Sequence, residues 1–147
     1  KGAQDTQMNI LRHHNRILTA FALAITLGTT SCKQASFDEQ CAQQAQEFTE
    51  KQCPQRIAEG IVLDSMTYTP SLRCLNYYYT LSGKIDDAKL IKNNESLFRE
   101  QLLSSITNSV ELKRPKSEGI SFRYIYTSKS TRKQLLSVTI RKEEYSK

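Results

Sequence analysis

A short apolar stretch near the N-terminus decides how much of this chain is available to fold. Residues 17–30 carry no charged side chain, and they follow a basic segment that contains Arg12 and Arg16. The stretch is too short to cross roughly 30 Å of bilayer hydrocarbon, which takes a helix of about 20 apolar residues. A basic start and a short apolar core followed by small residues are instead typical of a secretory signal. We therefore expect residues 1–31 to be a signal peptide with an extension upstream of Met8, and to contribute nothing to the fold.

The apolar stretch ends in small residues that lead into a cysteine, in the order Thr29-Thr30-Ser31-Cys32. This ending resembles the lipobox of bacterial lipoproteins, in which the cysteine becomes the first residue of the mature protein and carries lipid. That family prefers Leu three residues before the cysteine, whereas this chain has Thr29 there. The resemblance implies a palmitate-bearing Cys32, a tether over residues 32–35, and attachment to the outer membrane or the periplasmic face of the envelope. The alternatives are a buried apolar helix and a cleaved signal in which Cys32 is incidental.

The remaining residues, 36–147, are expected to form one domain that closes a single hydrophobic core. Without the three basic residues and one acidic residue of the signal, 18 basic and 14 acidic side chains remain, a net charge of +4. That charge suits a surface beside an anionic membrane, but it falls short of the basic stripe of a nucleic-acid-binding protein. We expect the protein to meet the membrane through its lipid anchor and to bind no nucleic acid.

Three cysteines, Cys41, Cys53 and Cys74, follow the candidate lipid-attachment site. Cys41 and Cys53 fall in one predicted helix, where their separation of about 18 Å exceeds the roughly 7 Å limit for a disulfide. Cys53 and Cys74 are the candidate disulfide for an oxidising compartment, although Cys74 would equally serve as a small buried hydrophobe. Both histidines lie in the signal, so we expect neither a metal site nor a cofactor.

Caps and hydrophobic periodicity predict two helices. A capping box at Ser36 begins the first and Cys53-Pro54 ends it, and its narrow apolar stripe predicts a peripheral helix. A longer helix begins after Asp86-Asp87 and ends near Leu112, with Asn93-Asn94 as a place where it could divide into two. The core face of this long helix consists of Ile91, Phe98, Leu102, Ile106 and Val110.

Two predicted hairpins supply the strands. The first joins residues 61–68 to 72–81 through a turn at Pro70, and the second joins 120–127 to 136–141. The order helix, hairpin, long helix, hairpin predicts an α+β fold. We expect an antiparallel four-stranded sheet made of two hairpins, with one long helix packed on a face and a peripheral N-terminal helix.

The length of the first hairpin loop sets which side chains share a face with Tyr77. A two-residue loop would bring one alternate set of the first arm onto that face, namely Val62, Asp64 and Met66. A three-residue loop would bring the other set there, namely Ile61, Leu63 and Ser65. We favour the three-residue loop because it leaves the Asp64 carboxylate in water.

Two outward strand residues are candidates for a partner surface. Adjacent strand residues face opposite sides, so Tyr78 opposes Tyr77 and Tyr79 and is exposed unless a helix or a partner covers it. A tyrosine combines an apolar ring with a hydrogen-bonding tip, which suits an interface. Arg123 likewise faces outward on the third strand, opposite the inward aromatics. We predict that Tyr78 and Arg123 contact a protein or glycan partner in the envelope.

Four strand segments repeat a pattern of alternating aromatic and aliphatic residues: Leu63-Asp64-Ser65, Leu75-x-Tyr77-x-Tyr79-Thr80-Leu81, Phe122-x-Tyr124-x-Tyr126 and Leu135-Leu136-x-Val138-x-Ile140. They resemble the strands of a group of small uncharacterised exported bacterial proteins that share a hairpin, helix, hairpin plan. The likeness covers residues 54–140. It implies an exported α+β domain and supplies no catalytic residue.

The mature chain lacks the residues of the common catalytic sites. No histidine follows the signal, so no Ser-His-Asp triad can form, and no glycine-rich phosphate loop occurs. We therefore expect a non-enzymatic interaction or assembly module of the envelope. The alternatives are a small hydrolase that pairs Asp64 with Asp86 or Asp87, and an inhibitor or immunity protein with an exposed apolar patch on its sheet.

Overall fold

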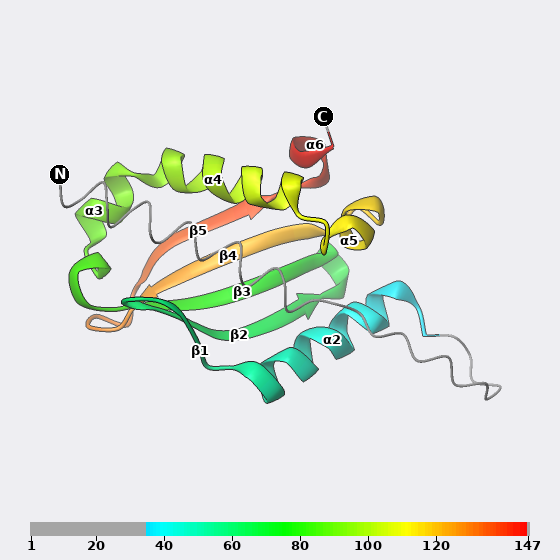
Figure 1. Ribbon diagram of the computed structural model, residues 1–147, viewed down its shortest axis with the longest axis horizontal. Coiled ribbons are helices and arrows are strands. Elements are labelled where there is room, and N and C mark those ends of the chain that lie inside the picture. Colours follow the sequence, from blue (N-terminus) through cyan, green and yellow to red (C-terminus); the bar gives the residue numbers. More distant parts are fainter. Residues whose placement is uncertain (1–34, 147) are drawn as a thin grey trace.

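A five-stranded sheet forms the centre of the protein, and the helices pack against it (Figure 1). The computed structural model describes residues 35–146. The strands lie side by side in sequence order: β1 Gln55–Ala58, β2 Ile61–Thr69, β3 Cys74–Leu81, β4 Ser121–Ser128 and β5 Gln134–Ile140. The helices are α2 Phe37–Gln52, α3 Ala88–Asn93, α4 Glu95–Asn108, α5 Lys113–Ser117 and α6 Lys142–Tyr145, with short 3-10 turns η2 Pro70–Leu72 and η3 Gly83–Ile85. The predicted α+β class is confirmed.

The sheet differs from the predicted one in strand number and strand direction. β1 was not predicted, and it pairs with the beginning of β2, so the sheet has five strands instead of four. β3 and β4 pair in parallel, from Cys74 beside Ser121 to Leu81 beside Ser128. The helices between these two strands carry the chain back along the sheet before β4 begins, and such a crossover produces parallel strands (Figure 1). The prediction of a fully antiparallel sheet was therefore wrong at this central pair.

The turn between β1 and β2 depends on Gly60. Its backbone has φ +75°, in the left-handed region that favours glycine. A Cβ atom at this position would lie 2.5 Å from the carbonyl oxygen of Ser82. The Ser82 N–H in turn donates to the Gly60 carbonyl at 2.8 Å, so the turn is held against the end of β3.

The predicted long helix divides into α3 and α4 at Asn94. The Asn94 side chain donates to the Leu90 carbonyl at 2.8 Å, and the Asn94 backbone has φ −116°, outside the helical range. Asp87 begins α3 as expected, because its carboxylate accepts from the N–H groups of Lys89 and Leu90. The single long helix is therefore corrected to two helices, at the place where the asparagine pair allowed a break.

The Lys116 side chain caps the C-terminal end of α4. Its ammonium group donates to the carbonyls of Ile106, Thr107 and Ser109 at distances of 2.7–2.9 Å. These carbonyls lie at the C-terminal end of α4, where the last turn of a helix lacks N–H donors four residues further on. Because α4 stops at Asn108, Val110 lies beyond the helix and is 77% exposed, so its predicted place on the core face was wrong.

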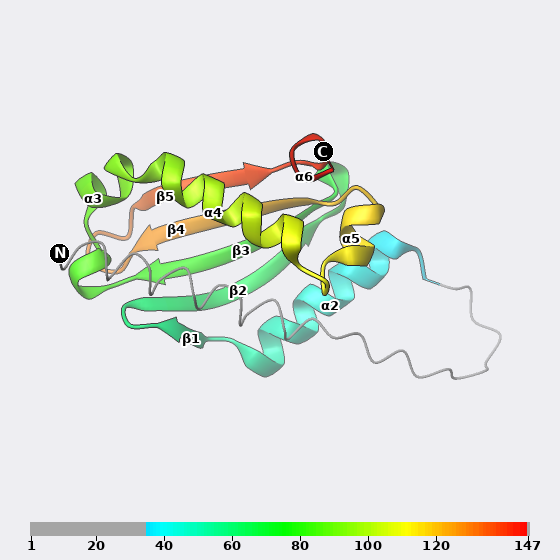
Figure 2. The ribbon, with the colours of Figure 1, turned by 45° about the horizontal axis from the view of Figure 1, so that its top comes forward.

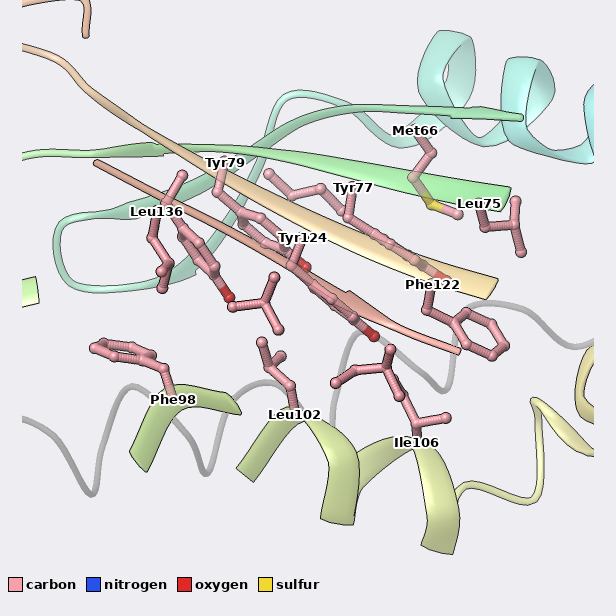
Figure 3. Packing of buried hydrophobic residues seen from close by; sticks show 14 of the residues in the cluster. Met66, Leu75, Tyr77, Tyr79, Phe98, Leu102, Ile106, Phe122, Tyr124 and Leu136 are labelled. Atoms are coloured by element: carbon pink, nitrogen blue, oxygen red, sulfur yellow. The ribbon is translucent and has the colours of Figure 1, made fainter. Parts of the chain in front are cut away.

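The core lies between the sheet and α4 and is built around stacked tyrosine rings (Figure 3). The parallel register sets Tyr77 beside Tyr124 and Tyr79 beside Tyr126. The ring centroids of these pairs lie 4.9 Å and 5.0 Å apart. Burial raises the pKa of all four phenols, which keeps them neutral at physiological pH. The α4 side chains that face the rings are Phe98, Leu102 and Ile106.

A bulge in β2 lets parts of both predicted side-chain sets reach the core. Leu63 pairs with Tyr79 and Met66 pairs with Tyr77, so two β2 residues three positions apart share one face. The irregularity falls between Leu63 and Ser65 and leaves Asp64 exposed. The first half of the strand follows the three-residue-loop pattern that we favoured, and the second half follows the alternative.

α2 lies along the edge of the sheet beside β2, and α4 crosses in front of the sheet in the view of Figure 2. The capping box is confirmed, since the Glu39 N–H donates to Ser36 Oγ and the Ser36 N–H donates to the Glu39 carboxylate. The predicted stripe is buried at Cys41, Ala45 and Phe48. Within residues 35–146, no helix combines the length and the apolar character that crossing a membrane requires.

Candidate functional site

The candidate functional site is the face of the sheet opposite the helices, which we call the open face. Ala45 and Phe48 of α2 belong to the same core as Tyr77, together with the buried side chains of α4 and α6. Alternate residues of β3 and β4 point the other way, and the parallel register aligns them in pairs. The open-face residues of these two strands are Cys74, Asn76, Tyr78, Thr80, Ser121, Arg123, Ile125 and Thr127.

Tyr78 lies between neighbouring strands near the middle of the open face. Its register partners are Ser65 on β2 and Ile125 on β4. The Thr67 hydroxyl lies 3.4 Å from the Tyr78 hydroxyl, to which it donates. Tyr78 is 36% exposed, whereas Tyr77 beside it is 3% exposed. The predicted opposition of these two rings is confirmed, and the Tyr78 ring remains available for contact.

Arg123 lies on the same face, on the strand next to Tyr78. It pairs with Asn76, two residues from Tyr78 along β3. Its Nε donates to Thr139 Oγ1 at 3.3 Å, and the ion pairs among residues 35–146 do not include it. The structure therefore places the two predicted partner-surface residues on neighbouring strands of one face, and the Arg123 guanidinium forms no ion pair with the described carboxylates.

Sequence reasoning missed Asn76, which is 2% exposed although it lies on the open face. Its amide nitrogen donates to the Thr69 hydroxyl at 3.0 Å and to the Thr67 hydroxyl at 3.2 Å. These bonds satisfy a buried polar group and hold the β2 side chains close to the sheet. The only sequence signal was a polar residue at an outward position between two strands, which by itself does not reveal burial.

Each carboxylate of the alternative hydrolase site has its own local partner. Asp64 accepts from the Thr80 hydroxyl at 2.7 Å. Asp86 accepts from the Ser130 N–H in the turn before β5. Hydrogen bonds from the Ser128 side chain, at the end of β4, and from this turn lower the pKa of the Asp86 carboxyl group. Asp87 caps α3. Each of the three carboxylates therefore has a local partner: for Asp64 on β3, for Asp86 in the turn before β5, and for Asp87 at the start of α3.

The described cysteines, among them Cys53 and Cys74 of the candidate disulfide, are free thiols in the structure. Cys53 lies two residues before Gln55, which pairs with Leu63 on β2. Cys74 instead begins β3, opposite Thr69 at the far end of β2. Burial is the main cause of a raised pKa at both thiols.

Two further expectations concern lipid and metal. Cys32 lies outside the described residues, so its lipid attachment stays a prediction. Within residues 35–146, no group of three or more His, Cys, Asp or Glu side chains is placed to hold a metal ion.

Comparisons with known proteins identify a matching family model and solved structures with a similar fold. Residues 36–136 match the model of a family described as "Domain of unknown function (DUF8479)". No curated protein matches the sequence. A crystal structure of a Pseudomonas aeruginosa protein inferred to be secreted has a TM-score of 0.61 and 16% identity, and covers 76% of this chain and 98% of its own. A pilotin from the Vibrio vulnificus type 2 secretion system has a TM-score of 0.56 and 8% identity, and covers 74% and 90%. At these identities the likeness shows a shared fold.

Proposed function

We propose that this chain, which belongs to the DUF8479 family, is an exported, lipid-anchored envelope protein that acts as a non-enzymatic binding or assembly module. Export is supported by the basic start and short apolar core before Cys32 and by the fold likeness to a protein inferred to be secreted. An assembly role is supported by the same fold in a pilotin of a type 2 secretion system.

The exposed ring of Tyr78 on the open face is the observation that carries the binding role. Hot spots of protein interfaces are enriched in tyrosine and arginine, and both residue types meet here on adjacent strands. Around them lie hydroxyl side chains that can exchange hydrogen bonds with a partner. Because Arg123 has no ion-pair partner among the described residues, we expect a partner protein that places a carboxylate opposite it.

Site-specific photo-crosslinking in the native host tests this role. A photoreactive phenylalanine analogue replaces Tyr78 in one strain and Leu97 in a matched control strain. Leu97 is also partly exposed, at 39%, but belongs to α4. We expect a discrete envelope-protein adduct from position 78 and none of the same mass from position 97. Identical adduct patterns from the two positions, or no protein adduct from position 78, would contradict the proposal.

A separate experiment tests the anchor. Cells expressing the full chain are grown with a clickable fatty acid, and the label on the protein is compared with that on a Cys32→Ala variant. We expect the variant to lose the label and to leave the membrane fraction. Unchanged labelling together with unchanged fractionation would show that Cys32 does not anchor the protein.

A further inference from the structure

The two most exposed large apolar side chains of the described residues both lie in connections rather than in the sheet or the long helices. Leu72 ends the η2 turn between β2 and β3 and is 56% exposed. Val110 lies between α4 and α5 and is 77% exposed. A single exposed leucine or valine is common and does not by itself indicate a binding surface. The positions of Leu72 and Val110 relative to each other therefore decide whether they form one.

Both side chains lie at the end of the molecule where α2 begins. Next to Leu72, Arg73 donates from Nε to Asp38 in the first turn of α2 at 3.1 Å. Four residues after Val110, the α5 residue Arg114 stacks on the Phe37 ring in the first turn of α2, 5.0 Å from its centroid. Figure 1 shows the start of α2, the β2–β3 turn and α5 gathered at one end, with α3 and the β4–β5 turn at the other.

This end also carries cations that form no ion pair with any described carboxylate. Lys113 and Arg114 are exposed and take part in no ion pair of residues 35–146. The carboxylates of this end have other partners. Glu39 accepts from the Ser36 N–H and Glu111 from the Ser109 hydroxyl, while Asp38 and Glu118 face Arg73 at 3.1 Å and 4.0 Å. Exposed apolar side chains beside unpaired cations are the combination that binds the interface of an anionic bilayer.

The position of the proposed anchor brings the same end to the membrane. Cys32 precedes Ser36, the N-cap of α2, by four residues. A fully extended connection of this length spans at most about 14 Å. Lipidation at Cys32 would therefore hold the start of α2, and with it Leu72 and Val110, within reach of the lipid headgroups.

We propose that the end of the domain formed by η2, the start of α2 and the α4–α5 connection docks on the surface of an anionic phospholipid bilayer. Leu72 and Val110 enter the interface, and Lys113 and Arg114 contact the lipid phosphates. This inference rests on the proposed envelope location and anchor. In the docked orientation the strands run away from the membrane, and Tyr78 lies about 13 Å further from the membrane than Cys74. The open face is then roughly perpendicular to the membrane and accessible to a partner from the side.

Tryptophan scanning tests the docked orientation, because the natural chain contains no tryptophan. The full chain, expressed with its own signal, is purified from membranes and reconstituted into phosphatidylethanolamine and phosphatidylglycerol vesicles. Leu72→Trp, Val110→Trp and the control Leu97→Trp are compared by emission wavelength and by quenching with brominated lipid. We expect blue-shifted emission and severalfold stronger quenching for the first two variants than for the control.

Flotation of the vesicles separates the possible failures. If the protein floats but the three tryptophans are quenched equally weakly, the docked orientation is overturned while the anchor stands. If the protein does not float, both the anchor and the docking are overturned. A Lys113→Glu substitution in the Leu72→Trp background should reduce quenching, whereas Lys133→Glu, in the turn at the opposite end, should not; equal effects of the two would also overturn the docking.

Discussion

The hydroxyl group of Thr49 takes the place of a neighbouring strand beside Met66. Thr49 Oγ1 accepts from the Met66 N–H at 2.8 Å and donates to the Met66 carbonyl at 2.9 Å. β1 pairs only with the first residues of β2, up to Leu63, so the rest of that edge would present unpaired backbone groups. The Thr49 side chain therefore satisfies the backbone N–H and carbonyl of Met66 at the edge of the sheet, and it links α2 to β2. We call this pair of hydrogen bonds the edge seal.

Replacing Thr49 with valine should test this seal, because valine keeps the branched shape and removes both hydrogen bonds. The Met66 N–H and carbonyl would lose their partner in a partly buried position, so we expect a loss of about 1–3 kcal/mol in the free energy of unfolding. Urea denaturation measures this loss. Thr107→Val, at an exposed position of α4, should cost much less; an equal cost at both sites would contradict the seal.

Asp38 should make stability depend on pH. Hydrogen bonds from Tyr68 and Arg73 hold the pKa of its carboxyl group below the ordinary value of 3.8. A lowered folded pKa favours the folded state above the unfolded pKa, and this contribution disappears as the pH falls through the folded value. We expect the stability difference between the natural protein and Asp38→Asn to be largest near neutral pH and to shrink below about pH 4.

Urea unfolding of both proteins at several pH values between neutral and acid provides the measurement. Glu50→Gln, an exposed substitution on the same helix, is the matched control and should show a small difference at every pH. A stability difference for Asp38→Asn that stays constant down to pH 3 would show that the Tyr68 and Arg73 contacts do not favour the ionised carboxyl group.

Substitutions at the adjacent residues Tyr124 and Ile125 should change the stability of the protein to very different extents. The Tyr124 ring stacks on Tyr77 and also lies 6.4 Å from the Tyr79 ring, so Tyr124→Leu removes aromatic contacts in a packed core. We expect it to destabilise the protein by about 2–4 kcal/mol. Ile125→Leu, on the open face, should change stability by less than about 0.5 kcal/mol. Thermal or urea unfolding of the two variants decides between this assignment of faces and its reverse.

A substitution at Tyr78 should weaken partner binding while leaving the stability of the protein almost unchanged. Because its ring is partly exposed, we expect Tyr78→Ser to leave the free energy of unfolding within about 1 kcal/mol of the natural value. The same substitution should reduce recovery of the envelope partner in a pull-down from solubilised membranes by tenfold or more, as truncation of an interface hot spot does. Undiminished recovery with Tyr78→Ser would remove the open face from the binding role.

Most of the local structure could be predicted because it depends on neighbours in the sequence. The capping box at Ser36 and the alternation that opposes Tyr77 to Tyr78 follow from cap chemistry and strand geometry. The break at Asn94 was a stated option that periodicity could not decide. The four-residue strand β1 gave too short a pattern to recognise, and its pairing depends on the turn at Gly60.

The sequence by itself determined which residues alternate along each strand and where caps could form, since these depend on contacts within a few residues. Only the tertiary structure decided that β3 and β4 run in parallel, that β2 bulges at Asp64, and that α4 packs on the Tyr77 face of the sheet. These features depend on how segments far apart in the chain pack, and one face of a strand gives no local sign of whether a helix or a partner will cover it. For the same reason the burial of Asn76 and the gathering of Leu72 and Val110 at one end emerged only from the folded chain.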